Sequence, residues 1–99
     1  MESIMSTEQG ICFICRKYCQ TELHHVFHGT ANRRIAEREG LGVFLCRGCH
    51  EKVHRDAKVN LWLERVGQAA WEKVFVEKGH TEDEARKRFM ELFGKNYIY

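Results

Sequence analysis

The pattern of hydrophobic and polar positions changes along the chain, from strand-like in the first half to helical in the second. Residues 21–27 and 42–45 are short runs with the residue types of β-strands, and residues 47 to about 56 favour a helix. The stretch 29–40 predicts a loop with one or two helical turns. The pattern therefore predicts a hairpin-like core followed by a helix within residues 10–58.

The second half of the chain carries two apolar stripes. Their members recur near helical spacing and are Leu61, Leu63, Val66, Ala70, Val74 and Phe75, then Ala85, Phe89, Leu92 and Phe93. Gly79 and Gly94 stand where a left-handed residue ends a helix, and Thr81 with Glu84 has the capping-box spacing. We expect residues 59–99 to form a two-helix extension packed on the core.

Length and composition fit this division. A chain of 99 residues with 43% hydrophobic residues suits one domain with a modest core, for which a bound metal is a natural supplement. Residues 1–9 hold acidic residues and no apolar segment of a signal peptide, so we expect a flexible tail. Because no apolar run is long enough to span a bilayer, we expect a cytoplasmic protein without a membrane partner.

Four of the five cysteines form two Cys-x-x-Cys pairs. Cys12 with Cys15 and Cys46 with Cys49 have the spacing of zinc knuckles, and two such knuckles make a closed tetrahedral site. In a reducing compartment this spacing indicates metal binding rather than a disulfide. We expect a structural zinc there, whose binding free energy stabilises the fold. Cys19 is left over, and we read it as a small buried residue or a free thiol.

The histidines are the second group of candidate metal ligands. His24 and His25 are adjacent, and His50 and His54 are four residues apart, so the latter two share one face of a helix. A third imidazole from the strand would complete a metal site and leave one histidine free as a base. A zinc held by cysteines explains none of these residues.

The basic residues gather in the segment that carries the histidines. Residues 29–58 hold seven basic and four acidic residues, a net charge of +3, against +2 for the whole chain. The excess favours a polyanion such as DNA, although charge alone is equally typical of a solvated face. The candidates for phosphate contacts are Arg33, Arg34, Arg47, Lys52 and Arg55.

The remaining histidines and the tryptophans allow simpler readings. We interpret His28 and His80 as ordinary core or surface histidines. Trp62 and Trp71 could stack on bases, but large aromatic side chains in a small domain more often pack in its core.

Two segments together resemble a known family. Glu22-Leu23-His24-His25, followed by residues 45–54 with the sequence Leu-Cys-Arg-Gly-Cys-His-Glu-Lys-Val-His, resembles the HNH endonucleases. The chain is similar to the small stand-alone members of phages and prophages, which add cysteine knuckles. The spacing of its histidines also resembles that of the colicin-type nucleases. The resemblance implies an α+β fold with a treble-clef-like ββα-metal core, DNA as substrate and the cytoplasm of a bacterial or phage-infected host cell.

The resemblance also implies a role for each site residue. His24, His50 and His54 would bind a divalent metal, and His25 would act as the general base that activates water. The family's motif has an asparagine in the strand before the second knuckle, where this chain has none. Asn32 could replace it by bonding backbone near His25, or it could be a turn residue.

The identity of the metal and the functional class stay open at this point. Three imidazoles suit zinc, nickel or manganese better than magnesium, although substrate oxygens could shift that preference. Double-strand cleavage could require a homodimer, and other phage proteins are conceivable partners. The alternative to a nuclease is a non-catalytic, zinc-stabilised module that binds nucleic acid or protein.

Overall fold

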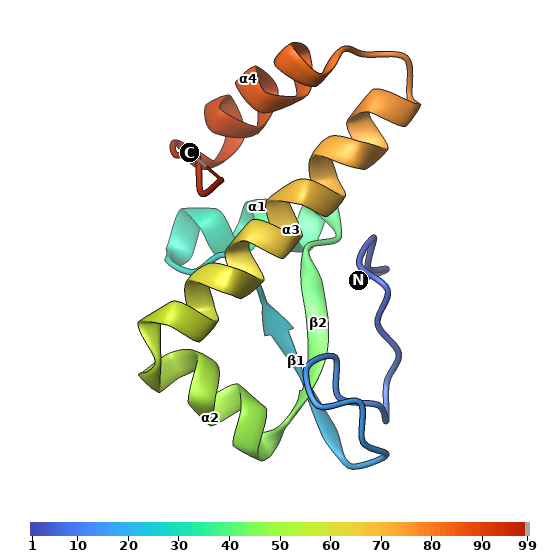
Figure 1. The fold of residues 1–99 in the computed structure, drawn as a ribbon, viewed down its shortest axis with the longest axis vertical. Coiled ribbons are helices and arrows are strands. Elements are labelled where there is room, and N and C mark those ends of the chain that lie inside the picture. The colour runs from blue at the N-terminus through green and yellow to red at the C-terminus, as the bar shows by residue number, and fades with distance from the viewer. Residues whose placement is uncertain (99) are drawn as a thin grey trace.

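The chain is an α+β protein with one two-stranded antiparallel sheet and four helices in residues 1–98, the part that a computed structural model describes. Its elements are, in order, β1 (Thr21–His25), α1 (Thr30–Glu39), β2 (Gly42–Cys46), α2 (Arg47–Arg55), α3 (Ala57–Glu77) and α4 (Glu82–Phe93) (Figure 1). The predicted strands and the helix after them are confirmed with ends shifted by one or two residues. The two helices of the extension are confirmed as well.

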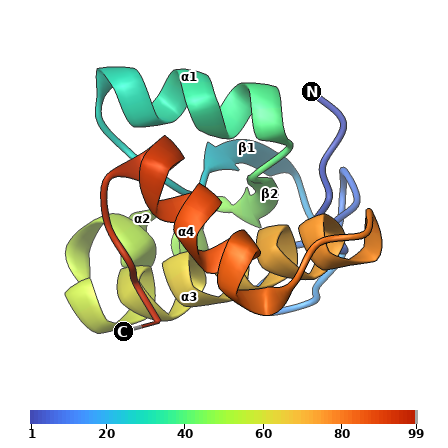
Figure 2. The same ribbon diagram turned by 90° about the horizontal axis from the view of Figure 1, so that it is seen from above.

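The two strands place neighbouring histidines on different sides of the sheet. They pair antiparallel, with Thr21 opposite Cys46, so the hairpin ends at the second cysteine knuckle. Because successive side chains of a strand point to opposite faces, His24 and His25 separate. His24 faces α2, and His25 contacts α1. Viewed from above, α1 lies on one side of the sheet and α3 on the other (Figure 2).

Helix α1 is longer than the one or two turns predicted for residues 29–40. It runs for ten residues between two glycines with positive φ, Gly29 (89°) and Gly40 (75°). At Gly40 a Cβ atom would also lie 2.7 Å from the backbone oxygen of Glu2, so a larger residue is excluded there. The sequence pattern underestimated the length of this helix because Ala36 is its only buried residue among those described.

Residues 1–9, for which the sequence predicts a flexible tail, make hydrogen bonds with the sheet. They lie along β2, where the Ser3 hydroxyl donates to the carbonyl of Gly42 at 2.6 Å. The Thr7 hydroxyl accepts a hydrogen bond of 3.0 Å from the backbone of the same strand. Met5 is buried in the core, at 4% exposure. A two-stranded sheet leaves an edge of β2 open, and this segment covers it.

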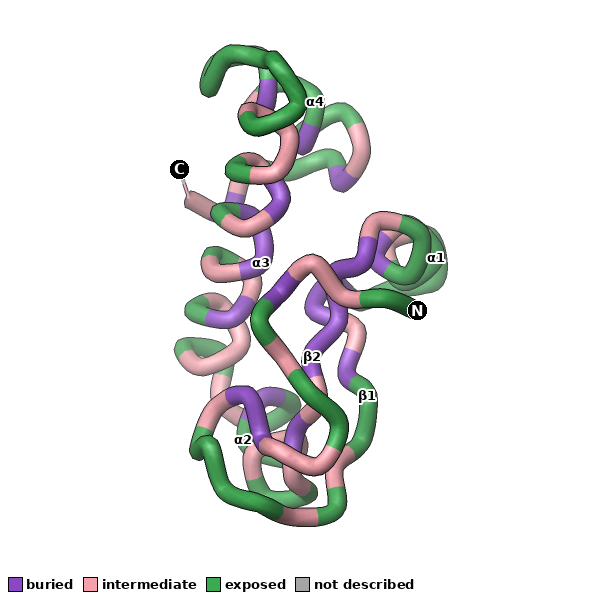
Figure 3. The backbone as a smooth tube through the Cα atoms, turned by 90° about the vertical axis from the view of Figure 1, so that its right-hand side faces the viewer, coloured by how far each residue is buried: buried purple, intermediate pink, exposed green. Residues whose placement is uncertain are grey.

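The extension supports the turn that follows the two histidines. Phe27 is fully buried, and its ring centroid lies 4.6 Å from that of Phe93 and 5.0 Å from that of Tyr97. On α3, a Cβ atom at Gly67 would come within 3.3 Å of the Phe27 ring, so the helix and the turn pack closely. The buried residues of the sheet, α3 and α4 meet in this region (Figure 3).

A buried amide ties the end of the chain to α3. Gln68 is completely buried, and its carbonyl oxygen accepts a hydrogen bond of 2.8 Å from the backbone of Tyr97. Its amide nitrogen donates to Glu72 at 2.8 Å and to Asn96 at 2.9 Å. The Glu72 carboxylate also accepts a hydrogen bond of 2.7 Å from Arg86 of α4. Each polar atom of this buried group is therefore satisfied, as burial requires.

The signals read from the extension are confirmed in detail. Thr81 and Glu84 form the predicted capping box, and Gly94 ends α4 in the left-handed conformation. Trp71 is buried and donates its ring N–H to Glu39 of α1 at 2.9 Å, so it packs as expected. Trp62 differs, because its side chain is 47% exposed. No helix within residues 1–98 is long and apolar enough to cross a membrane.

Candidate metal centres

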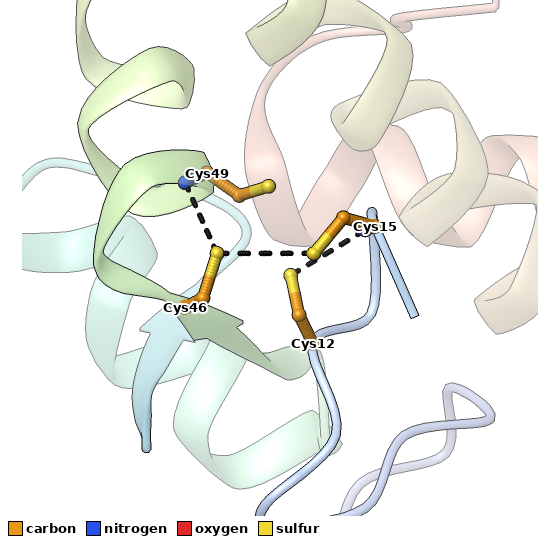
Figure 4. A group of neighbouring side chains, drawn as sticks. All are labelled: Cys12, Cys15, Cys46 and Cys49. Carbon is orange, nitrogen blue, oxygen red and sulfur yellow. Dashed lines mark hydrogen bonds between the residues drawn. The ribbon is translucent and has the colours of Figure 1, made fainter. Parts of the chain in front are cut away.

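The four knuckle cysteines lie together beside the end of the sheet (Figure 4). Their sulfurs are all within 4.8 Å of one another, and they belong to Cys12, Cys15, Cys46 and Cys49. A tetrahedral zinc with Zn–S bonds of about 2.3 Å requires sulfurs about 3.8 Å apart. The Sγ atoms of Cys15 and Cys46 are 3.9 Å apart. The cluster is therefore close to the geometry that holds a metal such as zinc.

Backbone N–H groups donate to two of these sulfurs, and the pKa values of the cluster diverge: burial and the neighbouring cysteines raise the pKa of Cys49 to about 12. The sulfur of Cys46 caps α2 and accepts a hydrogen bond of 3.4 Å from the backbone N–H of Cys49. The sulfur of Cys12 accepts a hydrogen bond of 3.5 Å from the backbone N–H of Cys15. Burial raises the pKa of Cys12, but the backbone hydrogen bonds outweigh it and lower the pKa to about 6. Cys19 lies outside the cluster, and its thiol donates to a backbone oxygen at 3.3 Å.

A second group consists of the three histidines predicted as ligands. His24 comes from β1, and His50 and His54 come from successive turns of α2; one ring nitrogen of each lies within 4.8 Å of those of the other two. The ring centroid of His24 is 5.1 Å from that of His50 and 5.5 Å from that of His54. The structure thus brings together three side chains that a single ion could bridge.

One ring nitrogen of His24 has no partner. The side chain is 3% exposed, and among residues 1–98 its Nε2 atom has no hydrogen-bond partner. Burial, aided by the neighbouring histidines, lowers the pKa of His24 to about 3, so the ring is neutral at neutral pH. A buried unpaired nitrogen is costly unless something binds its lone pair. Coordination of a metal would satisfy it, so the residues present fit such an ion.

A carboxylate orients one ligand of this group. Glu22 lies two residues before His24 on the same face of β1, and its Oε1 atom is 3.3 Å from Nδ1 of His50. Metal-bound histidines commonly donate their second ring N–H to a carboxylate, which fixes the ring and leaves the other nitrogen for the ion. The signal for this role in the sequence is the spacing of Glu22 from His24, which places both side chains on one face of the strand.

His25 lies close to the three ligands but is held from another direction. Its Nε2 atom makes a hydrogen bond of 2.7 Å with Oε1 of Glu37 on α1. This bond lowers the pKa of the Glu37 carboxyl, which is therefore ionised at neutral pH. Asn32, predicted to orient His25, is half-buried on α1, and none of the hydrogen bonds of the described residues joins its side chain to β1. Glu37 makes the contact instead.

His28, read from the sequence as an ordinary core or surface histidine, is exposed and lies next to the three predicted ligands. Its ring centroid is 4.9 Å from that of His24 and 5.4 Å from that of His54, distances like those within the three-ligand set. Its Nε2 atom contacts Oδ1 of Asn60 on α3 at 3.3 Å. Burial lowers the pKa of His28 as well. Its position depends on the turn after β1, which local sequence patterns did not specify.

The histidines open onto a cavity of about 600 Å³. All five of them line it, namely His24, His25, His28, His50 and His54. Arg33 and Arg34 line it too, with the start of α1 at Gly29. No side chain caps that helix end in the described structure, so its first N–H groups face the cavity region with partial positive charge. The cavity therefore combines side chains that could bind a metal with groups that attract an anion.

The other predicted phosphate contacts lie elsewhere on α2. Arg47 and Arg55 border a neighbouring depression of about 440 Å³ that shares His50 and His54 with the main cavity. Each of these arginines has a nitrogen 3.9 Å from a carboxylate oxygen of Glu51. Lys52 borders neither hollow. The structure thus separates Arg33 and Arg34, which face the histidines, from the other three basic residues.

Comparison of this chain with protein-family models, with curated proteins and with solved structures finds no match.

Proposed function

We propose that this chain is a metal-dependent endonuclease of the HNH type that hydrolyses phosphodiester bonds in DNA. The observation that carries the proposal is that His24, whose buried Nε2 atom has no hydrogen-bond partner within residues 1–98, brings a ring nitrogen within 4.8 Å of those of His50 and His54. Such a nitrogen costs stability in the folded protein unless a metal binds it. The resemblance of these segments to the HNH endonucleases points to the same ligands.

The two clusters divide the work between structure and chemistry. Four thiolates fill every position of a tetrahedral zinc, so we assign the cysteine cluster to a structural zinc. Three imidazoles leave at least one position free, which is the mark of a catalytic site, and this cluster opens onto the cavity. We leave the catalytic cation open among magnesium, manganese, nickel and zinc.

The remaining side chains supply the groups that phosphodiester hydrolysis needs. A divalent cation bound at the three histidines would supply Lewis-acid stabilisation of charge on the phosphate oxygens. His25 lines the same cavity and would accept a proton from the attacking water at its free ring nitrogen. Arg33, Arg34 and the start of α1 would hold the phosphate against the histidines.

The proposal is tested by cleavage of supercoiled plasmid with purified protein and one added cation at a time. We expect nicked or linear product with at least one of magnesium, manganese, nickel or zinc. His25→Ala should lower the rate by about 100-fold or more, the usual contribution of a general base. It should leave the fold and the cysteine-bound zinc intact. His80→Ala is the matched control, because that ring stacks on Phe75 at 4.0 Å and is absent from the cavity lining.

A wild-type protein that binds DNA but cuts none with any of the four cations would contradict the nuclease. It would favour the alternative of a non-catalytic, zinc-stabilised nucleic-acid-binding module. DNA binding should weaken steeply as salt is raised, since phosphate contacts release counterions. A flat salt response would argue against DNA as the substrate.

A further inference from the structure

Resting on the proposed function, we infer that Glu37 is the positioning residue for the general base. The carboxylate holds the ring of His25 so that Nδ1 is the nitrogen left to receive the proton of water. The sequence leaves Asn32 open between this task and a turn residue, and the contact with His25 is made by Glu37.

The chemistry of the contact fixes the tautomer. The Oε1 atom of Glu37 lies 2.7 Å from Nε2 of His25, the short distance of a hydrogen bond to an ionised group. A carboxylate can only accept, so Nε2 must carry the hydrogen that is donated. In neutral His25 the single ring proton is therefore on Nε2, and the lone pair is on Nδ1. A base needs that lone pair.

The position of Glu37 is itself well supported. It lies on α1, whose neighbouring residue Ala36 is buried in the core. Two residues further on, Glu39 accepts the ring N–H of Trp71 at 2.9 Å, which anchors the helix to α3. Groups on a packed helix hold a catalytic side chain more accurately than groups on a loop.

The alternative view is that this is an ordinary surface ion pair. Glu37 is 49% exposed, and pairs at such positions contribute little to stability. The His25 side chain, however, is only 13% exposed and lines the cavity that the three metal ligands share. A weak contribution to stability is compatible with a large one to catalysis, because positioning acts on one reacting atom. The two views therefore differ in tautomer and in rate rather than in melting temperature.

The experiment measures the tautomer of His25 and the rate of cleavage, both on the full chain. Nitrogen-15 NMR of labelled histidines, at a pH where the ring is neutral, reports which ring nitrogen carries the proton. Plasmid or oligonucleotide cleavage gives kcat and KM for wild type, Glu37→Ala and Glu37→Gln. Glu37→Gln keeps a carbonyl oxygen that can accept from Nε2. Glu91→Ala is the matched control, since it removes an exposed helical carboxylate paired with Arg88 at 3.5 Å on α4.

We expect the Nε2–H tautomer of His25 in wild type and a mixture of tautomers in Glu37→Ala. In that variant kcat should fall about tenfold or more, with KM changed less than about twofold, as is typical when an orienting partner is lost. Glu37→Gln should restore part of the preference for the Nε2–H tautomer and part of the lost kcat. Glu91→Ala should match wild type.

An active wild type with an unchanged tautomer in Glu37→Ala, or with a changed tautomer and unchanged kcat, would overturn the assignment while leaving the nuclease in place. A wild type that cleaves no DNA is a different failure, because it removes the proposed function and with it any base to position.

Discussion

The cysteine and histidine clusters share helix α2 but satisfy their polar atoms in different ways. At the start of the helix the Cys46 sulfur accepts a hydrogen bond from the backbone N–H of Cys49, and both residues belong to a complete set of four sulfurs. His50 and His54 lie one and two turns later and join His24, whose Nε2 atom has no partner in residues 1–98. The first cluster is closed, and the second is open to a cavity.

This difference teaches how one short helix can serve two purposes. A closed site has nothing left to bind a substrate, so its metal can contribute only to folding. An open site contributes less to folding and keeps positions for substrate and water. The comparison therefore makes separable predictions, because damage to one cluster should affect stability and damage to the other should affect catalysis.

The largest effect should come from the closed site. Cys46→Ser should unfold the protein at room temperature, because structural zinc binding of about 10–16 kcal/mol is comparable to or larger than a domain's whole stability. Serine can still cap α2, so the loss would report the metal rather than the cap. Circular dichroism and zinc content measure the outcome, with Cys19→Ser as the control. A Cys46→Ser protein that melts like wild type would break the comparison.

Damage to the open site should lower catalysis strongly and stability only slightly. His54→Ala should remove the second bound metal and lower DNA cleavage by more than about 100-fold, the upper end of the loss for an outer-shell partner. The stability of the metal-free fold should change by less than about 1 kcal/mol, because the side chain is exposed. Metal analysis, cleavage assays and thermal melts on the same sample separate these effects. Unfolding of His54→Ala would show that this site is structural too.

The buried amide of α3 should affect stability alone. Gln68→Ala leaves the Tyr97 N–H without its partner, which costs about 2 kcal/mol of unfolding free energy. Because Gln68 touches neither cluster, metal stoichiometry and kcat should be unchanged below the melting transition. Urea denaturation measures the loss. A change in metal stoichiometry would show that the extension shapes the site directly.

The smallest effect should come from the histidine that borders the open cluster. His28→Ala should lower the affinity of the second metal by about tenfold, as for a residue next to the ligands rather than among them. Calorimetric metal titration of zinc-loaded protein measures it, and Asn60→Ala should produce part of the same change through its contact with His28. An affinity equal to that of wild type would remove His28 from the account.

Local patterns specified much of the framework. The short runs of strand-forming residues predicted both strands, and the capping box at Thr81 and the stop at Gly94 predicted both ends of α4. Two knuckles and a histidine pair at helical spacing predicted which side chains would gather, because strand and helix geometry alone set their directions. The alternation of side chains along β1 also places Glu22 on the same face as His24, where it contacts His50.

What the sequence did not specify depends on contacts between distant segments. Glu37 reaches His25 only because α1 folds back across the sheet, twelve residues later in the chain. His28 joins the histidines because its turn is held by Asn60 of α3 and by the aromatic rings around Phe27. Residues 1–9 find the free edge of β2 in the same way. None of these contacts leaves a periodic signature in the sequence.

The most direct test is anomalous X-ray diffraction from crystals of the zinc-loaded protein soaked with manganese or nickel. The account predicts zinc among the four cysteine sulfurs and the added metal bonded to Nε2 of His24 and to His50 and His54. Added metal at any other place, or none at these three histidines with either cation, would contradict it.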